Sequence, residues 1–467
     1  MSAAILVWLR RDLRLDDNPA FAWALAQRAP LCPLYIYDPD AEAPWAPGSA
    51  SRWWLHHSLH ALAGDLAQRG LRLMSLRGPA LELIPALAAQ AGAGAVVCNS
   101  IHEPRLDDRD RRLGALLQST GRRLQLLPGG ALLPPGQILT GQGQTYRVFT
   151  PFWRNARRHL ELAPPQVQPW TGAAPDGWGE MPAAGPASLG LLDTHPWWHK
   201  LAAHWQPGEA GAWVRVRRFL DQAAGNYQQG RDRPDWDGTS RLAPHLHFGE
   251  ISPRRVWTLL QPLLAGDQGA AAGASAEAFL RQLGWREFAR ELLLAYPHTD
   301  WQCLDGRYGE DFWQEDPDAL AAWQRGETGV PLVDAGQREL WSTGWMHNRV
   351  RMLAASWLTK NLGIHWRHGA RWFWDTLVDA DLANNSLGWQ WVAGCGADAA
   401  PYYRIFNPDL QAARFDPQGS YRRRWLGDIR GLGPSLNPAR SRDAALRRHA
   451  RLMGTGPGTG PVNGELF

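Results

Sequence analysis

The pattern of apolar residues changes partway along this 467-residue chain, and that change limits the possible folds more than any other feature. In the first 130 residues, short apolar runs alternate with stretches of helical spacing such as 51–68, where leucines recur every three or four positions. The expected strands are 4–8, 33–37, 71–76, 95–98 and 124–127. Strands that alternate with helices over short turns predict a doubly wound parallel sheet in an α/β domain.

Helical spacing dominates after Trp213. One buried helix face is indicated by apolar residues at intervals of 3, 1, 3 and 1: Val350, Leu353, Ala354, Trp357 and Leu358. The stretch before Trp213, over about 163–208, is rich in proline, glycine and alanine. We therefore expect an α/β domain over 1–130, an interdomain connection over 131–208, an all-α domain over 209–453 and a flexible tail over 454–467.

Several protein classes are excluded. No apolar run approaches the roughly 20 residues that cross a bilayer, and the first apolar run precedes its charges, the wrong order for a secretory signal. The four cysteines, Cys32, Cys98, Cys303 and Cys395, form no CxxC pair, so we expect buried thiols rather than a disulfide framework or a zinc site. The chain has no GxGxxG or P-loop motif. We expect a cytoplasmic protein that binds no metal and no membrane.

Arginine and tryptophan are the two unusual components. The only lysines are Lys200 and Lys360, so arginine carries nearly all positive charge at a formal net charge of +4. Arginine suits phosphate binding, although a GC-rich genome would explain the same bias. The 27 tryptophans outnumber the 9 tyrosines and 12 phenylalanines combined. Composition leaves core packing, base stacking and electron transfer equally open as their use.

The stretch 225–250 combines a glycine turn with hydroxyl and guanidinium groups. Gly238, Thr239 and Ser240 can present backbone N–H groups and hydroxyls to an anion such as a pyrophosphate. The same residues also suit a helix cap. Tyr227, Arg231 and Arg241 lie in this stretch.

Two predicted helices carry polar and aromatic residues on one face. Gln282, Trp285 and Arg286 lie at i, i+3 and i+4, which suits either a pocket for a base or an ordinary half-buried helix. Asn348 and Met352 lie at i and i+4, and the methionine is either adaptable pocket wall or core filler.

Two aspartates, Asp379 and Asp381, precede Asn385, Trp389 and Trp391. Paired carboxylates occur in metal sites and glycosidases, but no third ligand or histidine spacing supports either. An arginine partner or ribose hydroxyls are therefore the better expectation.

Together with the opening VWLRRDLRLDDNPA, these stretches resemble the photolyase/cryptochrome flavoprotein family over residues 5 to about 426. TGWMHNR, DGTSRL and GWQW…DAAPYYRIFNP look most like bacterial class I cyclobutane pyrimidine dimer photolyases. The resemblance implies an α/β N-terminal domain and an all-α C-terminal domain that holds FAD.

The resemblance also implies which residues hold the FAD. They are Tyr227, Thr239, Ser240, Arg241, Leu242, Ala243, Arg286, Arg351, Asp379, Ala380, Asp381 and Asn385. Ala243 stands where the family often has serine, so one hydroxyl is lost. By the same resemblance Arg351 pairs with Asp379, and Asn385 faces flavin N5, where an amide helps keep the flavin reduced.

The resemblance also implies a relay of three tryptophans that supplies electrons to the flavin. In order from the flavin to the surface they are Trp389, Trp366 and Trp313. Core packing alone would also explain each of them. The damaged bases would flip into a cavity lined by Gln282, Trp285, Arg286, Asn348, Arg349, Met352 and Trp391. Arg231 and Gln411 match contacts to the DNA backbone, which weaken with salt.

Two positions depart from the family pattern. Dimer photolyases usually have glutamate where this chain has Gln282. Glutamine at this position is similar to the (6-4) photolyases and animal cryptochromes. Those relatives, however, have histidines at the positions that Asn348 and Met352 occupy in this chain. Cyclobutane dimer repair is therefore favoured. Arg105 and Leu106 replace the Asn-Glu of a folate site, so a deazaflavin, a flavin or no antenna at all stays open for a second chromophore.

We therefore expect a deoxyribodipyrimidine photo-lyase, a carbon–carbon lyase that uses light and reduced FAD to split pyrimidine dimers. The alternatives are a cryptochrome-type blue-light receptor, a (6-4) photolyase and a non-catalytic DNA-binding flavoprotein. The expected partner is UV-damaged DNA, and the expected state is a monomer with no obligate protein partner.

Overall fold

The computed structural model describes residues 3–160, 173, 178, 185–194, 196–266, 268–399, 403–427 and 436–454. The predicted tail lies outside the described residues apart from its first residue, as do much of the predicted interdomain connection and residues 400–402 of the last motif.

The N-terminal part is a five-stranded sheet in which every neighbouring pair is parallel. Its strands are β1 (Ala4–Leu9), β2 (Leu31–Tyr37), β3 (Met74–Arg77), β4 (Ala93–Asn99) and β5 (Arg123–Leu127), in the order β3-β2-β1-β4-β5. Val7 of the central strand pairs with Pro33 on one side and Val97 on the other. The predicted doubly wound parallel sheet is confirmed.

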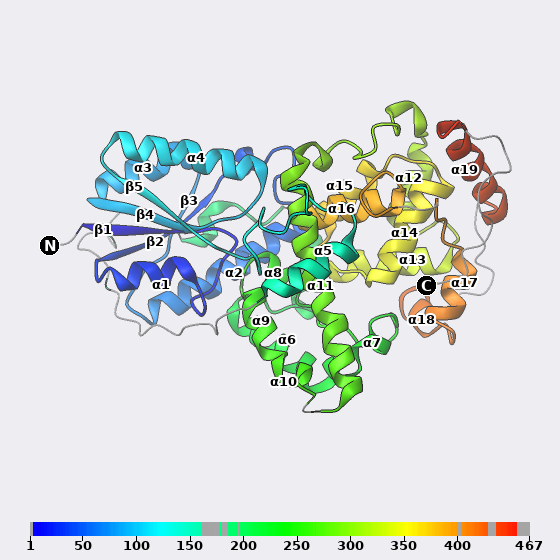
Figure 1. Ribbon diagram of the computed structural model, residues 1–467, viewed down its shortest axis with the longest axis horizontal. Helices are drawn as coiled ribbons and strands as arrows, with labels where there is room; N and C mark the ends of the chain where they lie inside the picture. The colour runs from blue at the N-terminus through cyan, green and yellow to red at the C-terminus, as the bar shows by residue number, and fades with distance from the viewer. Residues whose placement is uncertain are drawn as a thin grey trace.

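Four helices cover the two faces of this sheet (Figure 1). They are α1 (Pro19–Ala26), α2 (Ser49–Ala67), α3 (Ala80–Gln90) and α4 (Pro104–Ser119). Ile5 and Val7 face the core that α1 and α2 share, whereas Leu6 and Trp8 face the core of α3 and α4. A strand buried on both faces reads as a continuous apolar run, which is why the sequence revealed it.

One strand begins later than its apolar run. The run predicts a strand over 71–76, but β3 starts at Met74. Gly70 adopts a left-handed conformation (φ 73°), and the Leu71 N–H donates to Leu66 O at 3.0 Å to close the end of α2. The backbone N–H of Leu71 is therefore used to end α2, so the strand does not begin there although the Leu71 side chain is buried.

The rest of the described chain is helical. Its α-helices are α5 (Phe149–Ala156), α6 (Glu209–Gln222), α7 (Tyr227–Gly230), α8 (Ala243–His247), α9 (Pro253–Leu259), α10 (Gln261–Leu264), α11 (Ala270–Ala295), α12 (Pro317–Arg325), α13 (Pro331–Thr343), α14 (Asn348–Ser356), α15 (Trp366–Thr376), α16 (Leu382–Ala393), α17 (Pro408–Phe415), α18 (Ser420–Leu426) and α19 (Pro438–Leu452). A π-helical turn, η9 (Trp357–Asn361), continues α14. The expected all-α part is confirmed.

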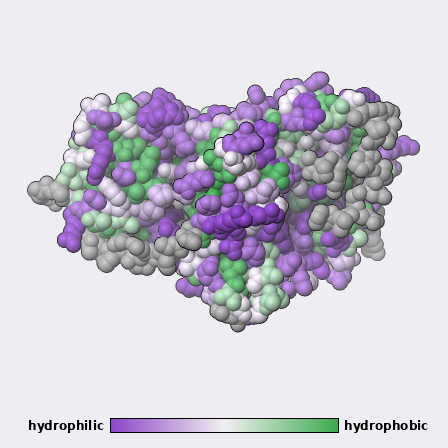
Figure 2. All heavy atoms as spheres, viewed as in Figure 1, coloured by the Kyte–Doolittle hydropathy of each residue, from purple (hydrophilic) through white to green (hydrophobic). Residues whose placement is uncertain are grey.

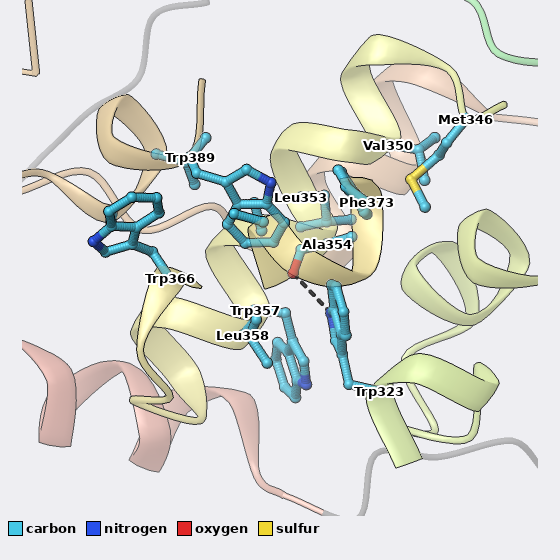
Figure 3. Close-up of a cluster of buried hydrophobic side chains, with 14 of the residues drawn as sticks. Trp323, Met346, Val350, Leu353, Ala354, Trp357, Leu358, Trp366, Phe373 and Trp389 are labelled. Atoms are coloured by element: carbon cyan, nitrogen blue, oxygen red, sulfur yellow. Dashed lines mark hydrogen bonds between the residues drawn. The ribbon is translucent and has the colours of Figure 1, made fainter. Parts of the chain in front are cut away.

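The predicted apolar face of α14 and η9 is buried. Val350, Leu353, Ala354, Trp357 and Leu358 are each at most 1% exposed. They face α12, α15 and α16 in one core (Figure 3). Burial of this stripe holds the polar N-terminal turn of α14 at the edge of the core, where the candidate site lies.

The N-terminal part and the helices contact each other through hydrogen bonds to backbone carbonyl groups. The Leu13 N–H donates to Phe248 O at 3.0 Å, and Trp374 Nε1–H donates to Ala46 O at 2.7 Å. Within the predicted interdomain connection, α5 packs on α11, with the Phe152 and Phe288 ring centroids 5.2 Å apart. The segment boundaries given above remain predictions.

Strongly hydrophilic side chains gather across the middle of one face, over the region of α5, α8 and α11 (Figure 2). Apolar side chains form separate patches on that face. Among the described residues, no helix has the length and apolar character needed to cross a membrane.

Candidate functional site

An arginine and a buried aspartate lie at the centre of the site. Asp379 occupies the turn between α15 and α16, and its side chain is 4% exposed. Arg351 of α14 donates from Nη2 to Asp379 Oδ2 at 2.9 Å and from Nε to Met346 O at 2.7 Å. Asp379 Oδ1 is buried and has no hydrogen-bond partner among the described residues. The carboxylate therefore has one oxygen ready to accept a donor from a ligand.

The second aspartate of the pair caps a helix. Asp381 Oδ1 accepts from the Asn384 N–H at 3.0 Å and from its side-chain amide at 2.7 Å, at the start of α16. His247 Nδ1 lies 3.5 Å from Asp381 Oδ2. Burial opposes ionisation, but the His247 contact and the charges of Arg286 and Arg290 hold the pKa of Asp381 well below its usual range. Asp381 is thus an anchored anion. Ala380, between the two aspartates, is buried.

Arg286 extends from α11 into the junction between sheet and helices. It donates to Gly130 O at 2.6 Å and to Leu246 O at 3.2 Å. Burial lowers its pKa to about 10, aided by the nearby Arg290 charge. Arg286, Asp381 and His247 line one cavity together with loop residues 99–103 of the sheet. The site thus includes residues from both parts of the chain.

The glycine turn before α8 closes the other side. Gly238 packs directly on the backbone of Gly230, where a Cβ atom at position 238 would lie 2.6 Å from Gly230 O. Tyr227 is buried, with its ring edge-on to Phe279 at 5.2 Å. Ser240 Oγ accepts from the Leu242 N–H at 3.3 Å. Thr239 is half-buried and Ala243 is exposed.

Arg241 has the most unusual backbone of the predicted set. Its φ is 51°, a left-handed conformation that is rare for a side chain of this size. Its guanidinium stacks on Trp345 at 4.5 Å, and its buried Nε has no hydrogen-bond partner among the described residues. Arg241 Nε makes no hydrogen bond but lies 3.5 Å from Asp237 Oδ1 in an ion pair, whereas Asp379 Oδ1 is an acceptor without a hydrogen-bond partner among the described residues. They fit a ligand that carries both phosphate groups and ring or hydroxyl donors, as FAD does.

The first predicted relay tryptophan is deeply buried on α16. Trp389 is 3% exposed and lies edge-on to Phe373 at 5.0 Å and to Trp323 at 6.1 Å. Its ring occupies the space where a side chain at Gly369 of α15 would sit. Trp366 lies one turn before Gly369 on the same helix, so the two relay indoles neighbour each other (Figure 3).

The outer two relay residues are connected through a histidine. Trp366 is fully buried, and its ring centroid lies 5.7 Å from that of His365. His365 lies 4.8 Å from Trp313, which is half-buried. Trp366 Nε1–H donates to Cys303 Sγ at 3.3 Å. The sequence analysis missed His365 and Cys303, because no pattern links them to the tryptophans.

The predicted cavity residues lie on three helices. Asn348 Nδ2 lies 3.7 Å from Met352 Sδ on α14, as their spacing predicts. On α11, Gln282, Trp285 and Arg286 are all half-buried on one helix face. The amide of Gln282 donates to Ala278 O at 3.2 Å within its own helix.

Both predicted aromatic walls are held in place. Trp285 stacks on Phe149 with ring centroids 3.8 Å apart. Trp391 of α16 donates from Nε1 to Asp398 O at 3.0 Å. Fixed indoles are suitable surfaces for a planar ring.

Two of the arginines predicted to contact DNA, Arg231 and Arg349, already share an acidic partner that no sequence pattern indicated. Asp232 accepts two hydrogen bonds from Arg349, at 2.8 and 3.0 Å, and lies 3.7 Å from Arg231. A phosphate would have to compete with this carboxylate for both guanidinium groups. Gln411 lies half-buried on α17. Within the described residues, no cluster of histidine, cysteine, aspartate or glutamate could hold a metal ion.

Comparisons with family models define the class. A model described as the FAD binding domain of DNA photolyase matches residues 279–448, and one described as DNA photolyase matches residues 5–169. Residues 279–448, which include the unpartnered Asp379 Oδ1, are therefore the FAD-binding part of a flavoprotein. The chain belongs to the DNA photolyase and cryptochrome family.

Two curated relatives show the range of that family. A deoxyribodipyrimidine photo-lyase of Agrobacterium fabrum is 41% identical over 92% of this chain and 88% of the relative. Cryptochrome-2 of Arabidopsis thaliana is 36% identical over 92% of this chain and 72% of the relative.

Solved structures agree. A class III photolyase of Agrobacterium tumefaciens has a TM-score of 0.90 and 37% identity over 97% of this chain and 98% of that one. An archaeal photolyase of Sulfolobus tokodaii with two FAD molecules has a TM-score of 0.82 and 26% identity over 96% of this chain and 100% of that one. The expected family is confirmed, but the narrower expectation of class I does not follow, because a class III structure matches this well.

Proposed function

We propose that this protein is a deoxyribodipyrimidine photo-lyase that repairs cyclobutane pyrimidine dimers in DNA under light. Bound reduced FAD would supply the photoexcited electron that splits the dimer and returns afterwards. The chain would bind the flavin, hold the damaged bases over it and exclude water. The FAD-binding part, the cavity and the relay described above support this proposal.

The contact between Asn348 and Met352 is the main observation that supports a cyclobutane pyrimidine dimer as the substrate. The pair lies on the first turns of α14, beside Arg349 and one turn from the Arg351–Asp379 pair. An amide and a thioether can contact the edges of two fused pyrimidines. Neither can donate a proton as an imidazolium does, which disfavours (6-4) repair.

Asn385 would tune the flavin. Its Nδ2 donates to Ala370 O at 3.1 Å, which fixes the orientation of the amide. Asn385 Oδ1 is then directed away from that bond and can accept the N5–H of a reduced flavin. A hydrogen bond accepted from N5–H would favour the reduced form of the cofactor.

The predicted relay would return an oxidised flavin to its reduced form. Its members, Trp313, Trp366 and Trp389, would pass electrons from solvent towards the flavin. The relay runs from a fully buried indole to a half-buried one through the ring of His365. The ring contacts that lead from Trp366 through His365 to the half-buried Trp313 support this role, whereas core packing alone does not need aromatic rings to approach the surface.

A second chromophore is part of the proposal, without assigned residues. The Sulfolobus tokodaii relative contains two FAD molecules. Extraction of the pigments from purified protein would identify any second chromophore here. A single extracted flavin would contradict this part of the proposal.

A cryptochrome-type receptor is the second candidate, because a cryptochrome is among the similar relatives. The deciding experiment uses one oligonucleotide with a cyclobutane thymine dimer and another with a (6-4) lesion, each incubated with holoprotein in blue light and in darkness. We expect light-dependent loss of the cyclobutane dimer only. Binding without repair would favour a receptor or a non-catalytic DNA-binding flavoprotein, and loss of the (6-4) lesion would favour that photolyase class.

A monomer that requires no protein partner remains our expectation. Sedimentation of the holoprotein with and without damaged DNA would test it.

A further inference from the structure

Two cysteines, Cys303 and Cys395, lie together beside the relay and have no part in the proposed repair. Cys303 accepts the Trp366 Nε1–H at 3.3 Å. The Cys303 and Cys395 side chains lie close enough to shift each other's ionisation. One oxidisable thiol, with a second thiol near it, therefore contacts the middle residue of a predicted electron path.

Two hydrogen bonds join the chain segment after Cys303 to the segment that ends at Cys395. The Asp305 N–H donates to Cys395 O at 2.9 Å, and the Leu304 N–H donates to Gln390 Oε1 at 2.8 Å. The two chain segments are thus fixed side by side at the cysteines. A disulfide needs sulfurs about 2.05 Å apart, so closure requires the two side chains on these adjacent segments to rotate towards each other.

The two thiols differ in character. The nearby Cys395 side chain lowers the pKa of Cys303, whereas burial and the nearby Cys303 side chain raise the pKa of Cys395. Cys303 is half-buried and Cys395 is fully buried. Since the thiolate is the reactive form, Cys303 is the cysteine that reacts first.

We propose that Cys303 and Cys395 are an internal dithiol that donates electrons to the tryptophan relay and closes to a disulfide. The inference rests on the proposed function, since it requires that light draws an electron from Trp366 towards bound oxidised FAD. Cys303 is in direct contact with the indole nitrogen, so it is the nearest group that can refill Trp366.

The reaction balances without any added reductant. Two thiols lose two electrons and two protons in total, one electron for each of two light-driven events, and one S–S bond forms. The electrons pass through Trp366 and Trp389 to oxidised FAD, whose two-electron reduction also accounts for the protons, together with solvent. A cellular thiol would later reopen the disulfide by exchange.

The other two cysteines provide a matched control. Cys32 and Cys98 are fully buried on β2 and β4, which β1 separates, so they cannot bridge. Their thiols should survive illumination. C98S therefore controls for the loss of a buried thiol elsewhere in the chain.

The test uses oxidised holoprotein under anaerobic blue light with no added reductant. Flavin reduction is followed by absorbance, the four thiols are counted after denaturation, and peptide mass spectrometry locates any disulfide. We expect wild type and C98S to lose two thiols for each flavin reduced and to yield a Cys303–Cys395 peptide. C303S and C395S should form no such disulfide and should reduce less flavin, and added dithiothreitol should restore their reduction.

A dark experiment separates the dithiol from the relay. Oxidised glutathione should close the same disulfide in apoprotein without light, in wild type and in W366F. Flavin reduction in wild type with all four thiols retained, or no dark closure, would overturn the dithiol donor and leave the proposed repair intact. Undiminished flavin reduction in W366F would instead overturn the relay itself.

Discussion

Arg351 and Asp379 form an ion pair of 2.9 Å in which only one carboxylate oxygen is used. Arg351 lies on α14, and Asp379 lies in the turn between α15 and α16. The pair therefore joins the helix that bears the cavity residues to the segment that carries Asp381. It leaves the other carboxylate oxygen without a hydrogen-bond partner among the described residues.

Asp379→Asn should weaken FAD binding while the apoprotein stays folded. The amide retains a contact with Arg351 but replaces a charged acceptor, whose hydrogen bond contributes about 1.5–3 kcal/mol, so the Kd for FAD should rise by about ten- to hundredfold. Fluorescence titration of apoprotein with FAD measures this.

Arg351→Met is the contrasting variant. It leaves the carboxylate buried and unpaired, and should lower the unfolding free energy of the apoprotein itself by about 3 kcal/mol. Equal FAD affinity in wild type and Asp379→Asn would contradict this assignment.

Trp366→Phe should slow photoreduction of oxidised FAD by at least about tenfold, equivalent to about 1.4 kcal/mol in a barrier, because phenylalanine is much harder to oxidise than indole. Repair by chemically pre-reduced enzyme should stay near wild type. Absorbance during illumination and a repair assay measure the two effects. Trp357→Phe, which alters another fully buried tryptophan of the same core, is the control. Parallel loss of both activities in Trp366→Phe would show a packing role only.

Gln282→Glu should preserve repair or raise it by up to about tenfold, about 1.4 kcal/mol. The Gln282 amide now donates to Ala278 O, and a carboxylate would be repelled by that carbonyl and turn towards the cavity. There the carboxylate can take up a proton from solvent, and in that protonated form it can donate to a dimer anion. The quantum yield of dimer loss at saturating substrate measures the effect. A collapse of the yield with normal DNA binding would show that the cavity is organised differently.

His347 should make stability depend on acid. It caps α14 by accepting the Arg349 N–H on Nδ1 at 3.2 Å, which requires an unprotonated nitrogen. Burial lowers its pKa to about 3, with nearby arginines adding to the shift. Because the unfolded chain binds the proton at about pH 6.5, this stabilisation is complete above pH 6.5 and is lost as pH falls towards 3.

His347→Asn keeps a capping acceptor that does not titrate. The unfolding free energy of wild type relative to this variant should therefore fall by up to a few kcal/mol between pH 6.5 and pH 4. Urea unfolding of both proteins across this range measures the difference. Glu339, whose pKa burial raises to about 7, contributes with the opposite sign in both proteins and so cancels. A constant difference with pH would refute the role of His347.

Local patterns in the sequence were sufficient for the sheet, the helices and several neighbours within one helix. The apolar runs predicted β1, β2 and β4, because strands buried on both faces leave a continuous signal. A short run also predicted the edge strand β5, although that strand is only partly buried. The i, i+4 spacing predicted the contact of Asn348 with Met352. The Arg351–Asp379 pair was expected only through family resemblance, since no local rule spans 28 positions.

Tertiary structure alone decided the contacts that join distant segments. Asp232 meets Arg349 across 117 positions, His247 meets Asp381 across 134, and Cys303 meets Trp366 across 63. Periodicity reports which face of an element is buried, but not which other element covers that face. That choice depends on how all the helices and the sheet pack together, and it determined which guanidinium, imidazole and thiol groups lie in the candidate site.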